Sequence, residues 1–364
     1  MNTYLVTGGA GFIGSNFVKH LLEKHKEAHV FCLDKLTYAG NLDNLKEELK
    51  NKRLTFTRGD INDIGALKKI FSGHEIDAVI NFAAESHVDR SIDDPQVFLK
   101  TNILGTQNLL KAAKEYWETS NGKYKENRRF IQVSTDEVYG SIKTGKFTER
   151  SPLDPHSPYA ASKAGADLIV NAYVDTYNFP AIITRCSNNY GPYQFPEKLI
   201  PLMLNNAING KHLPVYGKGK NVRDWIYVMD HCSAVDVVLQ KGKTGEIYNI
   251  GADCEKRNID TVNLLIKKIR VLLEKEQKYK NLINAPLGTI NENLIKFVED
   301  RPGHDFRYAM DSSKMRKLGW QPKTGFDDGM DLTIRWYFNN IGWLNKIVSG
   351  EYMEYYEKIH KGRH

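Results

Sequence analysis

The sequence is poor in cysteine and has no apolar run long enough to cross a membrane. Its four cysteines lie far apart and form no C-x-x-C pair of the kind that zinc and redox sites use. We therefore expect reduced, buried thiols and no metal site. Since a spanning helix needs about 20 apolar residues, we also expect no contact with a membrane.

Charge of one sign does not gather anywhere in the chain. The net charge is +7, yet lysine and arginine are interspersed with aspartate and glutamate, and there is no long basic run. We interpret most of these charges as solvated surface and expect no nucleic-acid partner. After Met1 the chain enters a short apolar run at once, so we expect no signal peptide and a cytoplasmic location.

The first half of the chain alternates short apolar runs with helical patterns. This rhythm predicts the α/β class, with a Rossmann-type, doubly wound parallel sheet. Strands are expected at 4–7, 30–33, 78–82 and 130–133, and helices at 16–24, 95–117 and 159–177.

The length of 364 residues exceeds the usual size of one hydrophobic core, so two domains are expected. From about Gly191 proline and glycine become frequent, as in loops over a cleft. We place the first domain at 1–190 and a smaller, substrate-binding α/β domain at 191–364. Elements near 226–250 are expected to return to the first domain.

Three glycines follow the first expected strand with the spacing G-x-x-G-x-x-G. Gly8 allows a tight turn, Gly11 lets the backbone approach a pyrophosphate, and Gly14 lets the next helix pack on the sheet. At the end of the second strand, Asp34 is placed to accept hydrogen bonds from ribose hydroxyls and to repel a 2′-phosphate. The pattern predicts NAD as the cofactor and disfavours NADP, although Lys35 lies beside this carboxylate.

A tyrosine and a lysine, Tyr159 and Lys163, stand four residues apart on one face of an expected helix. A tyrosine with a pKa near 10 is a poor base, so we assign Lys163 the task of stabilising its phenolate. On its own the pair is equally consistent with an exposed helix. Downstream of a glycine loop, it favours oxidation of a sugar hydroxyl.

Two adjacent carboxyl groups, Asp136 and Glu137, follow the strand that ends near Val133. They are expected at the carboxyl edge of the sheet, where such folds bind ligands, with Thr135 able to hydrogen-bond the reacting oxygen. Paired carboxyl groups can hold opposite protonation states, as elimination of water requires. The alternative is that Asp136 caps a helix and Glu137 is solvated.

Together these motifs resemble the extended short-chain dehydrogenase/reductase family, and the block from Thr135 to Gly140 resembles its dTDP-glucose 4,6-dehydratases. The likeness runs from Leu5 to about Trp336. Among enzymes it leaves open a UDP-hexose 4-epimerase or another nucleotide-sugar 4,6-dehydratase. From a different class, a non-catalytic NAD-sensing Rossmann protein would retain only the glycines.

The resemblance implies a lyase that converts dTDP-glucose to dTDP-4-keto-6-deoxyglucose and water. Tyr159 would deprotonate the C4 hydroxyl while NAD takes the C4 hydride. Glu137 would then remove the C5 proton, Asp136 would protonate the leaving C6 oxygen, and the hydride would return to C6. NAD is thereby regenerated in each turnover.

The resemblance also implies binding positions. For NAD, besides the glycines, Asp34 and the catalytic pair, they are Phe12, Ile13, Lys35, Leu36, Thr37, Asp60, Ile61, Ala83, Ala84, Ser86, Thr101 and Asn188. For the sugar nucleotide they are Ser86, His87, Thr135, Asn189, Glu197, Lys198, Leu199, Tyr216, Arg223, Asn258, Arg301 and His304. The arginines suit diphosphate oxygens, whereas a surface role for Asp60, packing for Tyr216 and a satisfied loop position for His87 stay open.

The two long helices, 95–117 and 159–177, are expected to pair with their copies in a homodimer through a four-helix contact. Two segments receive no role from their sequence: the polar stretch 114–129, interpreted as a loop, and the tail beyond Gly342 with its three tyrosines.

Overall fold

The structure is a computed structural model that describes residues 2–120 and 122–349. Seven parallel strands form its main sheet, in the order β3-β2-β1-β4-β7-β8-β12. They are β1 (Thr3–Thr7), β2 (His29–Asp34), β3 (Leu54–Arg58), β4 (Ala78–Asn81), β7 (Arg129–Thr135), β8 (Ala181–Cys186) and β12 (Ile247–Ile250). The strand order reverses between β1 and β4, and this reversal is where a ligand crevice opens at the carboxyl edge. The predicted Rossmann-type α/β fold is confirmed.

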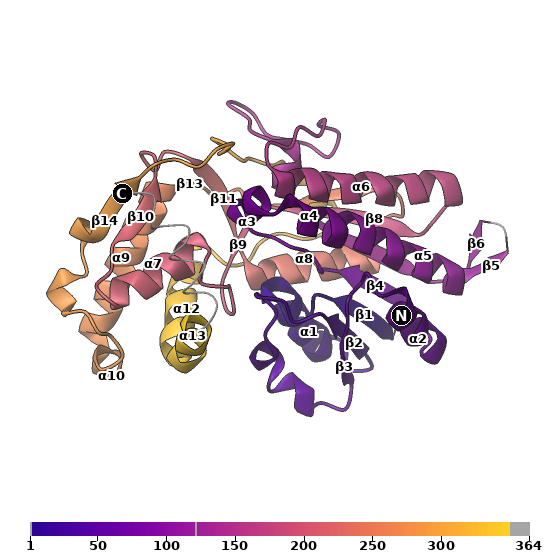
Figure 1. Cartoon of the computed structure of the whole chain (residues 1–364), viewed down its shortest axis with the longest axis horizontal. Helices are drawn as coiled ribbons and strands as arrows, with labels where there is room; N and C mark the ends of the chain where they lie inside the picture. The colour runs from indigo at the N-terminus through magenta and orange to yellow at the C-terminus, as the bar shows by residue number, and fades with distance from the viewer. Residues whose placement is uncertain (1, 121, 350–364) are drawn as a thin grey trace.

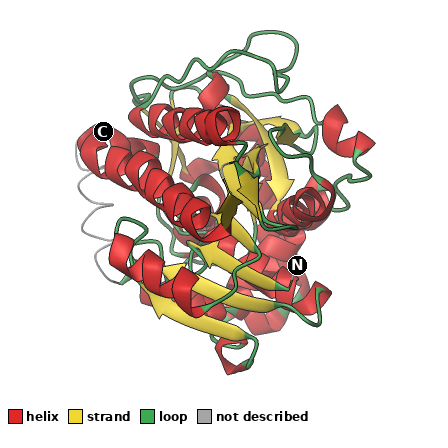
Figure 2. Cartoon of the chain, turned by 90° about the vertical axis from the view of Figure 1, so that its right-hand side faces the viewer, coloured by secondary structure: helices red, strands yellow, loops and turns green. Residues whose placement is uncertain are grey.

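Helices cover both faces of this sheet (Figure 2), which explains why its central strands are buried and mostly apolar. Tyr4 and Val6 of β1 pack on one face, while Leu5 packs on the other. The first face is covered by α1 (Phe12–Lys24) and α8 (Val228–Lys241), and the second by α2 (Ile64–Gly73), α5 (Thr106–Trp117) and α6 (Pro158–Tyr177). None of the four cysteines forms a disulfide; three are buried and Cys254 is half-buried.

The remaining elements form the second lobe and the connections around the site (Figure 1). The second lobe contains β9 (Asn188–Tyr190), α7 (Leu199–Ile208), β10 (Leu213–Tyr216), β11 (Val222–Tyr227), β13 (Glu255–Arg257), α9 (Asn258–Lys275), α10 (Gln277–Lys280), η5 (Leu287–Thr289), η6 (Glu292–Leu294), β14 (Ile295–Val298), α12 (Phe326–Asn339) and α13 (Ile341–Val348). Shorter connections are η1 (Leu42–Leu45), η2 (Glu48–Lys50), α3 (Val88–Asp93), η4 (Asp136–Tyr139) and α11 (Ser313–Lys317).

The second lobe has its own apolar core, built around α7, α9 and α12. The chain nevertheless returns to the first core, because β12 pairs with β8 and side chains of α8 pack against α1. The boundary between 190 and 191 stays a prediction. In the described part of the chain, no helix has both the length and the apolar character needed to cross a membrane.

Three local expectations change. The segment expected as one helix at 95–117 divides into α4 (Pro95–Phe98), a π-helix η3 (Leu99–Gly105) and α5. The wider π turn directs Asn102 onto the backbone of Glu85, whose N–H it accepts at 2.9 Å and whose carbonyl it donates to at 3.1 Å. The helix expected at 16–24 begins at Phe12, directly after the glycine loop.

The stretch 114–129, interpreted as a loop, contains a short hairpin of β5 (Glu118–Ser120) and β6 (Lys123–Tyr124). The Glu118 carboxylate supports it by accepting hydrogen bonds from the Gly122 N–H at 3.1 Å and from the Lys114 ammonium at 2.6 Å. The interpretation as a loop was therefore wrong for its central part. Of the tail beyond Gly342, α13 is described, and the three tyrosines lie outside the described residues.

The contact between α1 and α8 includes one carboxylate shared by two histidines. The Asp236 Oδ2 lies 3.0 Å from the Nε2 of His20, and its Oδ1 lies 2.9 Å from the Nε2 of His25. Burial raises the pKa of Asp236, but these histidines outweigh that effect and hold it below its usual value.

Replacing this carboxylate by Asp236→Asn is expected to lower the free energy of unfolding by about 2 kcal/mol at neutral pH, as for hydrogen bonds to charged groups. Because the folded pKa is depressed, the stabilisation is present above about pH 4, the unfolded pKa, and is lost as the pH falls through the lower folded pKa. Denaturant unfolding of both proteins over this range measures the difference. A difference that stayed constant into strong acid would contradict the assignment.

Candidate active site

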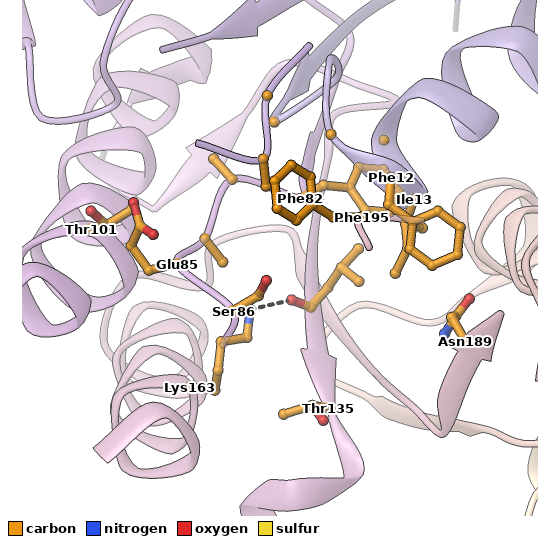
Figure 3. Close-up of a pocket in the computed structure, with 18 of the residues that line it drawn as sticks. Phe12, Ile13, Phe82, Glu85, Ser86, Thr101, Thr135, Lys163, Asn189 and Phe195 are labelled. Atoms are coloured by element: carbon orange, nitrogen blue, oxygen red, sulfur yellow. Dashed lines mark hydrogen bonds between the residues drawn. The ribbon is translucent and has the colours of Figure 1, made fainter. Parts of the chain in front are cut away.

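The carboxyl ends of the central strands open into one cavity at the point where the strand order reverses (Figure 3). All predicted cofactor positions line it except Leu36, which lines an adjoining hollow together with Thr37. The lining includes Gly8, Gly11, Phe12, Ile13, Gly14, Asp34, Lys35, Thr37, Asp60, Ile61, Ala83, Ala84, Ser86, Thr101, Tyr159, Lys163 and Asn188.

The glycine loop is shaped for close backbone approach. Gly8 has a φ of +67°, and a Cβ there would lie 2.6 Å from the Ala83 nitrogen. A Cβ at Gly14 would lie 2.2 Å from the Gly8 oxygen. Neither position accepts a side chain, and the loop leads straight into α1, whose amino end presents free N–H groups to an anion. These features fit the pyrophosphate of a dinucleotide.

Two acidic residues line the part of the cavity beside β2 and β3. The Asp34 carboxylate accepts hydrogen bonds from the Ala10 N–H at 2.9 Å and the Leu36 N–H at 2.8 Å. Lys35 forms an ion pair with Asp60, 2.9 Å from Nζ to Oδ2. This pairing removes the doubt that Lys35 raised about the cofactor, because its charge is directed to a carboxylate. The arrangement fits a ribose with free hydroxyls better than a 2′-phosphate.

The catalytic pair is presented by the first turns of α6, where Ser157 Oγ caps the helix by accepting from the Ala160 N–H at 3.1 Å. Lys163 reaches across to β7 and donates to the Val133 carbonyl at 2.7 Å, with Thr135 further along the same strand (Figure 3). Burial lowers the pKa of Lys163.

The pKa of Tyr159 departs from the sequence-based expectation. We expected Lys163 to lower it, but burial and then the charge of Glu137 raise it well above its usual value. Hydrogen bonding to Thr135 is what opposes this rise. The reason is physical: a phenolate loses its hydration in this enclosed site, and the carboxyl groups of Glu137 and Asp136 disfavour a further negative charge.

The two carboxyl groups sit side by side on η4 in different surroundings. Burial, followed by the neighbouring Glu137, raises the pKa of Asp136 well above its usual value. Burial raises the pKa of Glu137 too, but the charges of Arg301, Lys198 and Arg223 act against the rise. The pair is therefore biased toward a neutral Asp136 and an ionised Glu137.

The alternative in which Asp136 is a helix cap is wrong. Thr135 caps η4, because its hydroxyl oxygen accepts from the Glu137 N–H at 3.3 Å. The same hydroxyl donates to Asp136 Oδ1 at 3.2 Å, while the buried Asp136 Oδ2 has no hydrogen-bond partner among the described residues. Both carboxyl groups line the cavity, so Glu137 is not a solvated surface residue.

A second cavity adjoins the first and is lined mainly by the second lobe. The two share Ser86, Glu137, Asn188, Glu197 and Lys198. Of the predicted sugar-nucleotide positions, Thr135 and Asn189 line only the first cavity. The second is lined by Ser86, His87, Glu197, Lys198, Leu199, Tyr216, Arg223, Asn258, Arg301 and His304. Segments more than 200 residues apart thus meet around Glu137.

Buried polar atoms around the second cavity are left for a ligand. Among the described residues, Arg301 Nε, Asn258 Oδ1, Trp225 Nε1 and Asn188 Oδ1 are buried without hydrogen-bond partners. Native proteins satisfy nearly all such atoms, so their concentration here indicates a polar molecule. Arg223 differs, because it already donates to backbone carbonyls of Val222 and Asp305.

Several side chains around the cavities were open to two interpretations or were not expected. Both interpretations of His87 apply. It lines the second cavity, and its Nδ1 already accepts a hydrogen bond from the Arg90 N–H at 3.4 Å. Sequence reasoning missed Tyr38, whose hydroxyl donates to Glu197 at 3.0 Å under the Arg90 guanidinium. It also missed lining residues without a motif, namely Phe82, Phe195, Trp225 and Tyr308.

Comparison with known proteins places this site in a family. The model of the family described as GDP-mannose 4,6 dehydratase matches residues 5–333. The dTDP-glucose 4,6-dehydratase of Xanthomonas campestris pv. campestris (strain B100) is 48% identical over 354 residues, 97% of each chain. A solved dTDP-glucose 4,6-dehydratase of Streptomyces venezuelae with NAD bound has a TM-score of 0.82 and 46% identity, covering 94% of this chain and 98% of that one.

The fold and the site define the chain as an extended short-chain dehydrogenase/reductase. Within that class, the chain belongs to the dTDP-glucose 4,6-dehydratase family. The predicted family, the NAD-dependent lyase function and NAD as cofactor are confirmed. A UDP-glucose 4-epimerase of Thermotoga maritima, solved with UDP-glucose, is more distant, with 27% identity, 93% and 99% coverage of the two chains and a TM-score of 0.77. The roles of individual residues stay predictions.

Proposed function

We propose that this chain converts dTDP-glucose to dTDP-4-keto-6-deoxyglucose and water, and that the residues described above carry the reaction. The observation that carries the proposal is the unequal surroundings of Asp136 and Glu137 at the junction of the two cavities. Among the candidate reactions, only elimination of water needs an acid and a base that act at C5 and C6. A relative that matches over nearly the full length of both chains is named dTDP-glucose 4,6-dehydratase.

The first stage is oxidation at C4. Tyr159, buried beside Thr135 and Lys163, accepts the proton of the C4 hydroxyl, while Thr135 offers a hydrogen bond to the same oxygen. NAD, when bound, supplies a cationic ring that takes up the hydride from C4 and later returns it to C6. Burial opposes ionisation of Tyr159 in this structure. We therefore assign the ammonium of Lys163 the task of stabilising the phenolate, so that Tyr159 can act as a base.

The second stage is elimination across C5 and C6. A C4 ketone acidifies the C5 proton, which the Glu137 carboxylate removes. Asp136, kept neutral by burial, donates a proton to the departing C6 oxygen, so the leaving group is water. Arg301 and Lys198 oppose the rise that burial causes in the pKa of Glu137, and the same cations suit the substrate diphosphate. Return of a proton from Glu137 to C5 accompanies the reduction at C6, and proton exchange with solvent restores Tyr159 and Asp136, so the redox changes at C4 and C6 cancel.

An epimerase is disfavoured by the same carboxyl pair, since inversion at C4 involves no proton transfer at C5 or C6. Choice of base is a finer matter, because one methyl group discriminates by only about 1–3 kcal/mol in a pocket. The matching family model is named for GDP-mannose, and the relatives are named for dTDP-glucose. A relative at 48% identity is more informative about the substrate than the broad family model, so we propose dTDP-glucose as the preferred substrate.

Incubation with dTDP-glucose, UDP-glucose and GDP-mannose in separate reactions is the direct test. We expect a 4-keto-6-deoxy sugar from dTDP-glucose at a rate at least tenfold above the other two, measured by mass spectrometry of the products. A 4-epimer, or preferential turnover of GDP-mannose, would overturn the substrate assignment.

The Glu137→Gln variant tests the base. It preserves shape but removes the proton acceptor, so we expect entry of solvent deuterium at C5 to slow by about 10²–10⁴-fold, the usual range for general-base catalysis. Tyr159→Phe is the matched comparison, because it should stop the reaction earlier, before hydride leaves C4. Unchanged deuterium entry in Glu137→Gln would rule out its assigned role.

A homodimer through the long helices is also part of the proposal. Large apolar side chains are exposed on these helices and on α3 before them, namely Ile92, Val97, Leu99, Leu104, Leu168 and Tyr177. Leu104 and Leu168 are more than half exposed, which is costly for leucine unless another surface covers it. A second copy of the same face is the covering surface we propose. The cytoplasmic location also stays a prediction.

Light scattering on Leu104→Lys and Leu168→Lys tests this contact. Both charges would be buried in the proposed interface, so we expect the variants to become monomeric at micromolar concentration while the parent chain is a dimer. Phe297→Lys, at an exposed position on β14, is the control and should leave the mass unchanged. A monomeric parent chain would refute the proposal.

A further inference from the structure

The glycine loop is anchored on both sides of Ala10, a buried residue between Gly9 and Gly11. Its N–H donates to the Asp34 carboxylate. Its carbonyl accepts two hydrogen bonds, from the Asn41 N–H at 3.0 Å and from the Asn44 Nδ2 at 2.8 Å. The position of this carbonyl therefore depends on the side chain of Asn44.

The Asn44 amide is in turn oriented by the other end of the chain. It is 1% exposed on η1, and its Oδ1 accepts a hydrogen bond from the Trp343 Nε1 at 2.8 Å. An indole can only donate and a carbonyl can only accept, so both ends of the amide are determined: the oxygen faces Trp343 and the nitrogen faces Ala10. Reversing the amide would lose both bonds.

Trp343 is held rigidly on α13, the yellow helix that follows α12 in Figure 1. Its ring lies against Trp336 and Tyr337 of α12, with centroids 5.1 and 6.1 Å away, and against Tyr193 at 5.9 Å. This cluster belongs to the second lobe, whereas η1 follows β2 of the sheet. The indole is thus a fixed donor that crosses from one lobe to the other.

We propose that Asn44 and Trp343 are positioning residues for the dinucleotide site, through the hydrogen-bond chain from Trp343 to Asn44 to the Ala10 carbonyl. The inference rests on the proposed use of NAD and adds a determinant that touches neither cofactor nor substrate. Without the indole donor, Asn44 is free to turn, and the loop that approaches the pyrophosphate loses one of its two side-chain anchors. Loss of this anchor should weaken the affinity for NAD. It should leave the chemical step unchanged, because Tyr159 and Glu137 take no part in this hydrogen-bond chain.

Direct measurement of NAD binding tests the chain of bonds. Trp343→Phe retains the aromatic packing and removes the donor, so we expect the Kd for NAD to rise about tenfold while kcat at saturating NAD stays within twofold. Asn44→Asp still accepts from Trp343 but places a carboxylate oxygen against the Ala10 carbonyl, and should raise the Kd more. Lys346→Ala removes an exposed lysine of the same helix that pairs with Asp43, and should leave the Kd within twofold.

The double variant Trp343→Phe with Asn44→Ala should bind NAD no more weakly than Asn44→Ala alone, since the two act through one contact. A merely structural role would lower the melting temperature of Trp343→Phe and leave its Kd for NAD unchanged, which would overturn the inference. Additive losses in the double variant would overturn it as well. Failure of the parent chain to bind NAD would instead contradict the proposed function.

Discussion

The electrostatic constraint at the centre of this protein is that two adjacent carboxyl groups, Asp136 and Glu137, are removed from water together. Burial makes ionisation costly for both, and the first charge makes the second costlier. The structure distributes cations unequally: Arg301 and Lys198 oppose the rise in the pKa of Glu137, whereas Arg223 acts on both carboxyl groups. The sheet supplies the position of the pair, whereas the second lobe supplies most of the charge that separates their protonation states.

Sequence reasoning located the chemistry that lies in contiguous motifs. The glycine loop, the acidic end of β2, the Thr135 to Glu137 block and the Tyr159–Lys163 pair each carry a local reason for their spacing. The spacing of short apolar runs predicted the parallel sheet, because central strands covered on both faces are mostly apolar. What sequence could report well was therefore either local or periodic.

The rest depended on tertiary contacts that have no local signature. The π turn at Leu99–Gly105 looks like ordinary helix in its side-chain periodicity, and the contact of Asn102 with Glu85 that accompanies it is visible only in the fold. Spacing reveals the lysine near Tyr159 but not the desolvation of the phenolate, which raises the pKa of this tyrosine. Likewise, only the fold shows that Tyr308 lines the second cavity and that Tyr38 lines the adjoining hollow.

The same dependence on distant residues makes the two lobes a single functional unit. Arginines and a lysine on one side of the junction oppose the rise in the pKa of Glu137, and an indole on α13 supports the glycine loop through Asn44. Both links run from the second lobe to the sheet, one at the substrate end of the cavity and one at the cofactor end. A rigid-body shift between the lobes would therefore weaken acid–base chemistry and cofactor support together. The contacts at Glu137 and Asn44 therefore make both ends of the site depend on the relative position of the two lobes.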